Sequence, residues 1–256
     1  MRRDLGSPTE PRYGTPVADD QWRVLIAVPA LNESRSIADV VTAARAAGPY
    51  DVLVIDDGSS DDTAQRAADA GARVIRLPFN HGVGGAMRTA FLVAEREGYD
   101  RVVQVDGDGQ HDPAEIPALL EATRDHDIVI GARFAGAGDY TVRGPRRWAM
   151  RMLASSLSRV SGATLTDTTS GFRASSRKAI ELFAHRYPAE YLGDTVESLV
   201  LASRSGLTVT QLPVHMRERQ GGTPSHGPLK SSLNLGRTML ALVVALTRRT
   251  DAGGDL

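Results

Sequence analysis

The clearest signal of the fold is the stretch Arg101-Val102-Val103-Gln104-Val105-Asp106-Gly107-Asp108-Gly109-Gln110-His111. Its first half is a short apolar run of the kind that forms a buried strand. Asp106 and Asp108 follow where that strand should end, and α/β folds bind ligands at the carboxyl ends of strands. Paired carboxylates suit hard cations such as Mg²⁺ or Mn²⁺. Taken alone, however, the stretch could equally be an acidic, glycine-rich surface turn.

Strands and helices alternate on both sides of this stretch. We expect strands at residues 23–28, 51–55, 73–77, 101–105 and 127–130, separated by helices at 34–47, 61–71, 82–98 and 113–124. The second half predicts helices at 145–160, 194–205 and 228–249 and a strand at 207–212, with loops at 162–173 and 217–227. This order predicts a single α/β domain with a mostly parallel central sheet that helices cover on both faces.

Composition narrows the class of protein. The chain has 256 residues, of which 41% are hydrophobic and 24% charged, and its net charge of −1 gives no reason to expect nucleic acid as a partner. The absence of cysteine excludes disulfides, thiolate metal sites and cysteine nucleophiles. Residues 1–21 predict a disordered leader without a signal peptide. We expect a catalytic domain at 22–227, an amphipathic helix at 228–249 and a flexible tail at 250–256.

Three polar clusters follow three of the expected strands. They are Pro29-Ala30-Leu31-Asn32-Glu33, Asp56-Asp57-Gly58-Ser59 and Asp106-Gly107-Asp108. Carboxyl ends of parallel strands share one edge of a sheet, so these clusters should meet in a crevice and form a binding site. Any one of them could instead be helix-capping chemistry, as we expect for Asp61 or Asp62.

Two further features suit phosphate groups. The turn His81-Gly82-Val83-Gly84 opens a helix, and could either cradle a phosphate or allow close packing of the helix start. Met87 stands where a dinucleotide-binding fingerprint would need glycine. Arg133, Arg173 and Arg219 follow sheet elements or lie in loops, where guanidinium groups could bind phosphate oxygens or simply be solvated.

Taken together, the motifs resemble a family 2 glycosyltransferase, and more narrowly the dolichyl- and polyprenyl-phosphate sugar synthases. The resemblance covers residues 23–235 and rests on segments 29–33, 54–59, 80–84, 106–111 and 170–173. It implies inverting transfer from a nucleotide-diphosphosugar, UDP- or GDP-linked, to a polyprenyl phosphate, in a Rossmann-like glycosyltransferase A fold.

The resemblance also implies roles for individual residues. Asp106 and Asp108 would bind a divalent metal, Mg²⁺ or Mn²⁺, and the donor diphosphate. The acceptor phosphate would contact Arg133, Ser170 and Arg173. The donor nucleotide would contact Pro29, Ala30, Asn32, Glu33, Asp57, Gly84, Gly107, Arg219 and Ser225. Arg219 and Ser225 belong to a C-terminal loop that departs from the family pattern, because its spacing is looser and His226 replaces a lysine.

The acceptor decides whether a general base is needed. A hydroxyl acceptor must lose a proton, whereas a lipid phosphate is already an anion. Asp194 and Glu197 are three residues apart at a helix start and are the candidate bases, with helix capping as the alternative role.

Basic, apolar segments at 133–159 and 229–249 suit an anionic membrane surface. We therefore expect a cytoplasmic enzyme, peripheral at the inner face of the membrane or bound to a membrane protein. The alternatives are core-packing helices for these segments, and, for the whole chain, a transferase with a saccharide or small-molecule hydroxyl acceptor, a nucleotidyltransferase or a non-catalytic binding module.

Overall fold

The computed structural model describes residues 22–132, 155, 157–159, 162–188 and 194–217. Its elements in chain order are β1 (Val24–Ala30), α1 (Ile37–Ala46), β2 (Asp51–Asp56), α2 (Thr63–Asp69), β3 (Arg73–Arg76), α3 (Gly82–Arg96), β4 (Arg101–Gln104), η1 (Pro113–Glu115), α4 (Ile116–Ala122), β5 (Ile128–Ala132), β6 (Arg173–Ser175), α6 (Arg177–Arg186), α7 (Asp194–Arg204) and β7 (Val209–Pro213). The expected leader, the helix at 228–249 and the tail lie outside these residues, as does most of the helix expected at 145–160.

The strands form one seven-stranded sheet in the order β3-β2-β1-β4-β6-β5-β7. Every pair is parallel except the two made by β6, which runs antiparallel to both β4 and β5. The predicted fold, a mostly parallel sheet covered by helices, is confirmed. The strand β6 was not predicted, because three residues are too few to show a period in the sequence.

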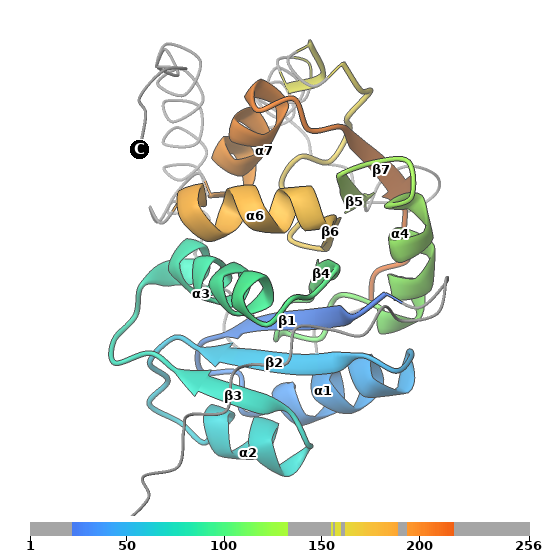
Figure 1. The fold of residues 1–256 in the computed structure, drawn as a ribbon. Coiled ribbons are helices and arrows are strands. Elements are labelled where there is room, and N and C mark those ends of the chain that lie inside the picture. Colours follow the sequence, from blue (N-terminus) through green and yellow to red (C-terminus); the bar gives the residue numbers. More distant parts are fainter. Residues whose placement is uncertain (1–21, 133–154, 156, 160–161, 189–193, 218–256) are drawn as a thin grey trace, which may run out of the picture.

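Helices cover both faces of the sheet (Figure 1). In β1, Leu25 and Ala27 belong to a core cluster that includes residues of α3, α6 and α7, whereas Ile26 and Val28 belong to a second cluster with residues of α1 and α4. Because β1 is buried on both faces, all seven of its residues are buried, and the strand shows a continuous apolar run in place of an alternating one.

The helix α6 was also not predicted, although its signal is local. The Ser176 hydroxyl caps it by accepting the Ala179 N–H at 3.4 Å, and Ala179, Ile180, Phe183 and Ala184 form its buried face. Among the described residues, no helix is both long and apolar enough to cross a membrane.

The sheet brings the carboxyl ends of β1, β2 and β4 to one edge. The Asp57 amide, just beyond β2, donates to the Ala30 carbonyl of β1 at 2.9 Å, and the Val105 amide, just beyond β4, donates to the Ala27 carbonyl at 3.0 Å. These hydrogen bonds extend the pairing of β1 with β2 and β4 up to the polar clusters. The clusters therefore begin at adjacent positions on the rigid sheet.

Candidate active site

The loops after β1 and β4 are in direct contact. A β-carbon added to Gly107 would lie 3.3 Å from both the Ala30 β-carbon and the Pro29 carbonyl oxygen, so glycine allows the two loops to close on each other. The Ser36 hydroxyl then bonds the Gly107 carbonyl at 2.7 Å. Pro29, Ala30 and Gly107, all predicted to contact the donor nucleotide, therefore lie close together at this edge of the sheet.

Asn32 ties the loop after β1 to the loop after β2. Its backbone has a φ of 56°, a left-handed conformation that asparagine tolerates better than most residues. Its amide donates to the Ser59 hydroxyl at 2.9 Å, and its side-chain oxygen accepts the Ser60 amide at 2.9 Å. Next along the chain, the Glu33 amide donates to the Thr63 hydroxyl at 2.9 Å, so the start of α2 is joined to the same loop.

Asp57 anchors the start of α3. Its carboxylate accepts the backbone amides of His81 at 2.7 Å and Gly82 at 2.8 Å. Burial raises the pKa of Asp57, and the two amide hydrogen bonds oppose that shift. A carboxylate therefore already occupies the anion-binding amides at the helix start, and Gly84 is buried within α3. This arrangement favours helix packing over a phosphate cradle for the turn at 81–84.

The two acidic residues after β4 differ from each other in their partners. The Asp106 side chain is 39% exposed. Its Oδ1 accepts from Gln104 Nε2 at 3.1 Å, and its backbone amide donates to His111 Nδ1 at 2.9 Å. Asp108 Oδ1 accepts the Gln110 amide at 3.0 Å, which shapes the turn. Asp106 thus keeps a solvent-facing carboxylate at the edge where the three loops converge.

The segment Ser170–Arg173 packs against Asp106 from the other side of the site. A β-carbon on Gly171 would lie 2.8 Å from Asp106 Oδ1 and 2.9 Å from Gln104 Nε2. Ser170 is buried, and its hydroxyl accepts the Phe172 amide at 3.3 Å. The structure therefore brings together Asp106 and Ser170, two predicted site residues that are far apart in the sequence.

Arg173 lies inside the protein and is only 6% exposed. Its guanidinium donates to the carbonyl oxygens of Thr168, Ser170 and Thr195 at 3.0, 2.9 and 2.9 Å, and to the Ser198 hydroxyl at 3.2 Å. The residue therefore joins the 168–170 loop to the start of α7. Its expected contact with phosphate stays a prediction. The hydrogen bonds in the structure show that Arg173 holds the 168–170 loop against the start of α7.

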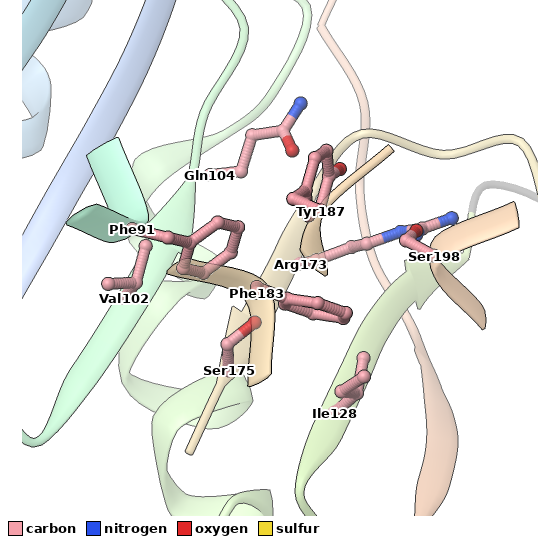
Figure 2. Close-up of a pocket in the computed structure, with 9 residues that line it drawn as sticks. All are labelled: Phe91, Val102, Gln104, Ile128, Arg173, Ser175, Phe183, Tyr187 and Ser198. Carbon is pink, nitrogen blue, oxygen red and sulfur yellow. The ribbon is translucent and has the colours of Figure 1, made fainter. Parts of the chain in front are cut away.

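Behind this arginine is a small enclosed cavity between the sheet and the helices α3, α6 and α7 (Figure 2). Its volume is about 10 Å³, roughly the space that one water molecule needs. Gln104, Arg173 and Ser198 reach it from the polar side, and Phe91, Phe183 and Tyr187 line its apolar part. A nucleotide sugar cannot fit there, so this cavity is not the donor site.

Four predicted site residues lie wholly or partly outside the described part of the chain. They are Arg133, Arg219 and Ser225, together with the side chain of Asp194. Asp194 begins α7, and Glu197 follows within the first turn of the same helix. Both therefore belong to the helix that Arg173 ties to the Ser170 loop.

Four residues around this edge were not among the predicted site residues: Gln104, His111, Gly171 and Arg217. Arg217 donates its amide to the Gln110 carbonyl at 2.8 Å, and its guanidinium pairs with Asp112 at 2.7 Å. These contacts join the chain after β7 to the acidic turn. No local sequence pattern predicts these contacts, because each depends on which loops the sheet brings side by side.

Comparison with known proteins identifies the family. The family described as glycosyl transferase family 2 matches residues 25–183. The chain belongs to this family. It is 36% identical to an undecaprenyl-phosphate mannosyltransferase of Micrococcus luteus over 211 residues, which cover 78% of this chain and 86% of that protein. It is 28% identical to a polyprenol monophosphomannose synthase of Mycolicibacterium smegmatis over 230 residues, 86% of this chain and 85% of that one.

A solved structure supports the same fold. Glucosyl-3-phosphoglycerate synthase from Mycobacterium tuberculosis, in complex with Mn²⁺, uridine diphosphate and phosphoglyceric acid, superimposes with a TM-score of 0.68 at 20% identity. The match covers 91% of this chain and 82% of the synthase. The protein is therefore a glycosyltransferase, and its expected membership of family 2 and its expected fold are confirmed.

Proposed function

We propose that this glycosyltransferase transfers a sugar, with inversion, from a nucleotide-diphosphosugar to a polyprenyl phosphate. The observation that carries the proposal is the meeting of Asp106, the loop after β1 and the Ser170 segment at one open edge of the sheet. The names of the Micrococcus luteus and Mycolicibacterium smegmatis relatives, a mannosyltransferase acting on undecaprenyl phosphate and a polyprenol monophosphomannose synthase, support the acceptor class.

The donor nucleotide, uridine or guanosine diphosphate, would lie along the loops after β1 and β2. Pro29, Ala30, Asn32, Glu33 and Asp57 would contact its base and ribose. Hydrogen bonds between the Asn32 and Ser59–Ser60 segments hold these loops in one geometry before the donor arrives. Such preorganisation lowers the entropy cost of binding. Gly107, Arg219 and Ser225 complete the donor contacts in this proposal, whereas Gly84 is assigned to the packing of α3.

Asp106 and Asp108 would hold a divalent cation, Mg²⁺ or Mn²⁺. The residues fit such an ion, because the Asp106 carboxylate is partly exposed and carboxylate oxygens are the ligands that these cations prefer. Among the described residues no three acidic or histidine side chains converge on one point, so the donor diphosphate and water would have to supply the remaining ligands. A bound cation would neutralise charge on the departing nucleoside diphosphate.

The acceptor phosphate would lie near Ser170 with Arg133. Arg173 holds the Ser170 loop against the start of α7, so it would set the position of the acceptor phosphate relative to Asp106. Because a lipid phosphate is already ionised, it can attack without giving up a proton. Asp194 and Glu197 would then shape the helix start and not serve as bases. The segment at 228–249 would lie at the cytoplasmic membrane surface or on a membrane protein.

One experiment tests both the acceptor and the need for a general base. Labelled UDP- and GDP-sugars are offered with polyprenyl phosphate in vesicles, or with soluble saccharides, with and without a chelator. We expect transfer to the lipid alone, loss of transfer on chelation, and substantial turnover by Asp194→Asn and Glu197→Gln. If one of these variants binds donor normally but loses all transfer, and a saccharide is the better acceptor, a hydroxyl-acceptor transferase replaces this proposal.

A further inference from the structure

His111 is placed to control the geometry of Asp106. It lies five residues further along the chain, its side chain is 4% exposed, and its Nδ1 accepts the Asp106 amide at 2.9 Å. A backbone amide can only donate, so Nδ1 must present its lone pair. The neutral imidazole therefore carries its proton on Nε2.

The protonated side of the ring then serves the carboxylate of the same residue. Nε2 of His111 lies 3.6 Å from Asp106 Oδ2, too far for a full hydrogen bond but close enough for electrostatic attraction. The other oxygen, Oδ1, accepts from Gln104 Nε2 at 3.1 Å. Each carboxylate oxygen of Asp106 thus has a nitrogen donor beside it, and the two donors come from opposite ends of the turn.

Contacts with two distant segments hold His111 in place: its ring stacks on one residue and its backbone pairs with another. The imidazole stacks on Phe172, whose ring is fully buried, with 4.8 Å between ring centroids and 13° between ring planes. The backbone of His111 is held separately, because it pairs with Met216 in an antiparallel bridge and the Arg217 amide donates to the neighbouring Gln110 carbonyl at 2.8 Å. The ring cannot turn away from Asp106 without losing its stacking on Phe172 and its bond to the Asp106 amide.

We propose that His111 is a positioning residue that orients the Asp106 carboxylate toward the cation and the donor diphosphate. The inference rests on the proposed function, which makes Asp106 a metal ligand. His111 itself would touch neither the cation nor the donor. Residues that orient metal ligands in this way typically change metal affinity or activity by about 10–100-fold when they are replaced.

Two variants separate the roles of the ring. His111→Phe keeps a flat ring against Phe172 and removes both nitrogens. His111→Asn keeps an oxygen near the Nδ1 position, where it can accept the Asp106 amide. Mn²⁺ affinity, with and without UDP or GDP, is measured from the electron paramagnetic resonance signal of the free ion, beside the melting temperature and the kcat and KM for the donor.

We expect His111→Phe to weaken Mn²⁺ binding about 10-fold or more, with His111→Asn between it and the wild type. Asp106→Asn should lose Mn²⁺ binding, and adding His111→Phe to Asp106→Asn should cause no further loss, because His111 acts through Asp106. Ile180→Ala, in the buried face of α6 on the opposite side of the sheet, lowers stability without touching this loop and should bind Mn²⁺ normally.

The outcomes distinguish a failure of the proposed role of His111 from a failure of the proposed function. If Asp106→Asn loses Mn²⁺ and His111→Phe binds it like the wild type, the role of His111 is overturned and the proposed function stands. If Asp106→Asn binds Mn²⁺ and transfers sugar normally, the metal role of Asp106 fails and the inference fails with it. Should His111→Phe not fold, His111→Asn and His111→Gln are judged by the same criterion.

Discussion

Gly171 packs against the carboxylate of Asp106 so closely that no side chain fits between them. A β-carbon at position 171 would lie 2.8 Å from Oδ1 and 3.0 Å from Oδ2 of Asp106. The third near atom, Nε2 of Gln104 at 2.9 Å, is also the end of a side chain. The segment 170–173 therefore limits where the Asp106 carboxylate can lie, although 65 residues separate Gly171 from Asp106 in the sequence.

Gly171→Ala should reduce activity far more than stability. The added methyl group meets only side-chain ends, so the Asp106 carboxylate moves while the backbone stays in place. A displacement of about 1 Å at a reacting centre can lower the rate about 10²-fold. Steady-state kcat and the melting temperature are measured together.

Gly48→Ala is the matched control for that variant. Its added methyl group would also meet only a side chain, that of Tyr50 at 2.5 Å, and this glycine precedes β2 at the opposite end of the strand from the site. We expect wild-type turnover from Gly48→Ala. Equal kcat values for the two alanine variants would show that the contact between Gly171 and Asp106 has no catalytic consequence.

Asp57→Ala should destabilise the protein by removing the anchor of α3. The His81 amide would lose its carboxylate acceptor, and a hydrogen bond to a charged group contributes about 1.5–3 kcal/mol. The Gly82 amide would lose its bond to Asp57 but keeps Asn80 Oδ1 as an acceptor at 2.9 Å. Asp57→Asn keeps one acceptor oxygen and should lose less. Urea denaturation gives the free energy of unfolding. Asp62→Ala is the control, since exposed Asp62 makes no side-chain capping bond at α2, and a loss as large as that of Asp57→Ala would contradict this account.

Arg173→Lys should lower both stability and activity although it keeps the positive charge. A lysine ammonium is a single point with three donors, and cannot reach the carbonyl oxygens of Thr168 and Thr195 and the Ser198 hydroxyl together. Each acceptor left without a partner costs about 1–3 kcal/mol. Val41→Ala, in the buried face of α1, supplies a comparison at similar stability. Lysine at 173 with full stability and full kcat would mean that its carbonyl contacts are dispensable.

Tyr99 should make the protein lose stability at alkaline pH. Burial raises the pKa of Tyr99 from 10.0 to about 12, and its hydrogen bond to Asp51 Oδ2 at 2.8 Å adds to the shift. Because the folded state holds the phenol proton more tightly, the stabilisation is fully present below pH 10.0 and is lost as the pH rises toward about 12. Tyr99→Phe has no proton to lose, so its stability should fall less steeply over that interval. Chemical denaturation at several pH values measures both slopes, and parallel slopes would contradict the assignment.

The sequence by itself determined the frame of the fold and the edge of the sheet that carries the candidate site. Parallel strands buried on both faces show continuous apolar runs, as β1 does, and each βα connection sends the following polar residues to the same edge of the sheet. That local chemistry was sufficient to expect Asp57 and Asp106 on one crevice, and to recognise a family that the comparison with known proteins then confirmed. The helix α6 was not predicted, although the Ser176 cap and the spacing of Ile180 and Phe183 are local signals that could have indicated it.

Only the tertiary structure decided how the site residues are held. In the folded protein, β6 lies between β4 and β5, and the Arg173 guanidinium donates to backbone carbonyl oxygens. His111 stacks on Phe172, and Gly171 packs against Asp106. Each of these contacts joins segments that are remote in the sequence, and side-chain period and capping residues report only on neighbours along the chain. A buried guanidinium donates to carbonyl oxygens that packing has removed from water. Which carbonyl oxygens these are depends on how the loops pack in the folded protein.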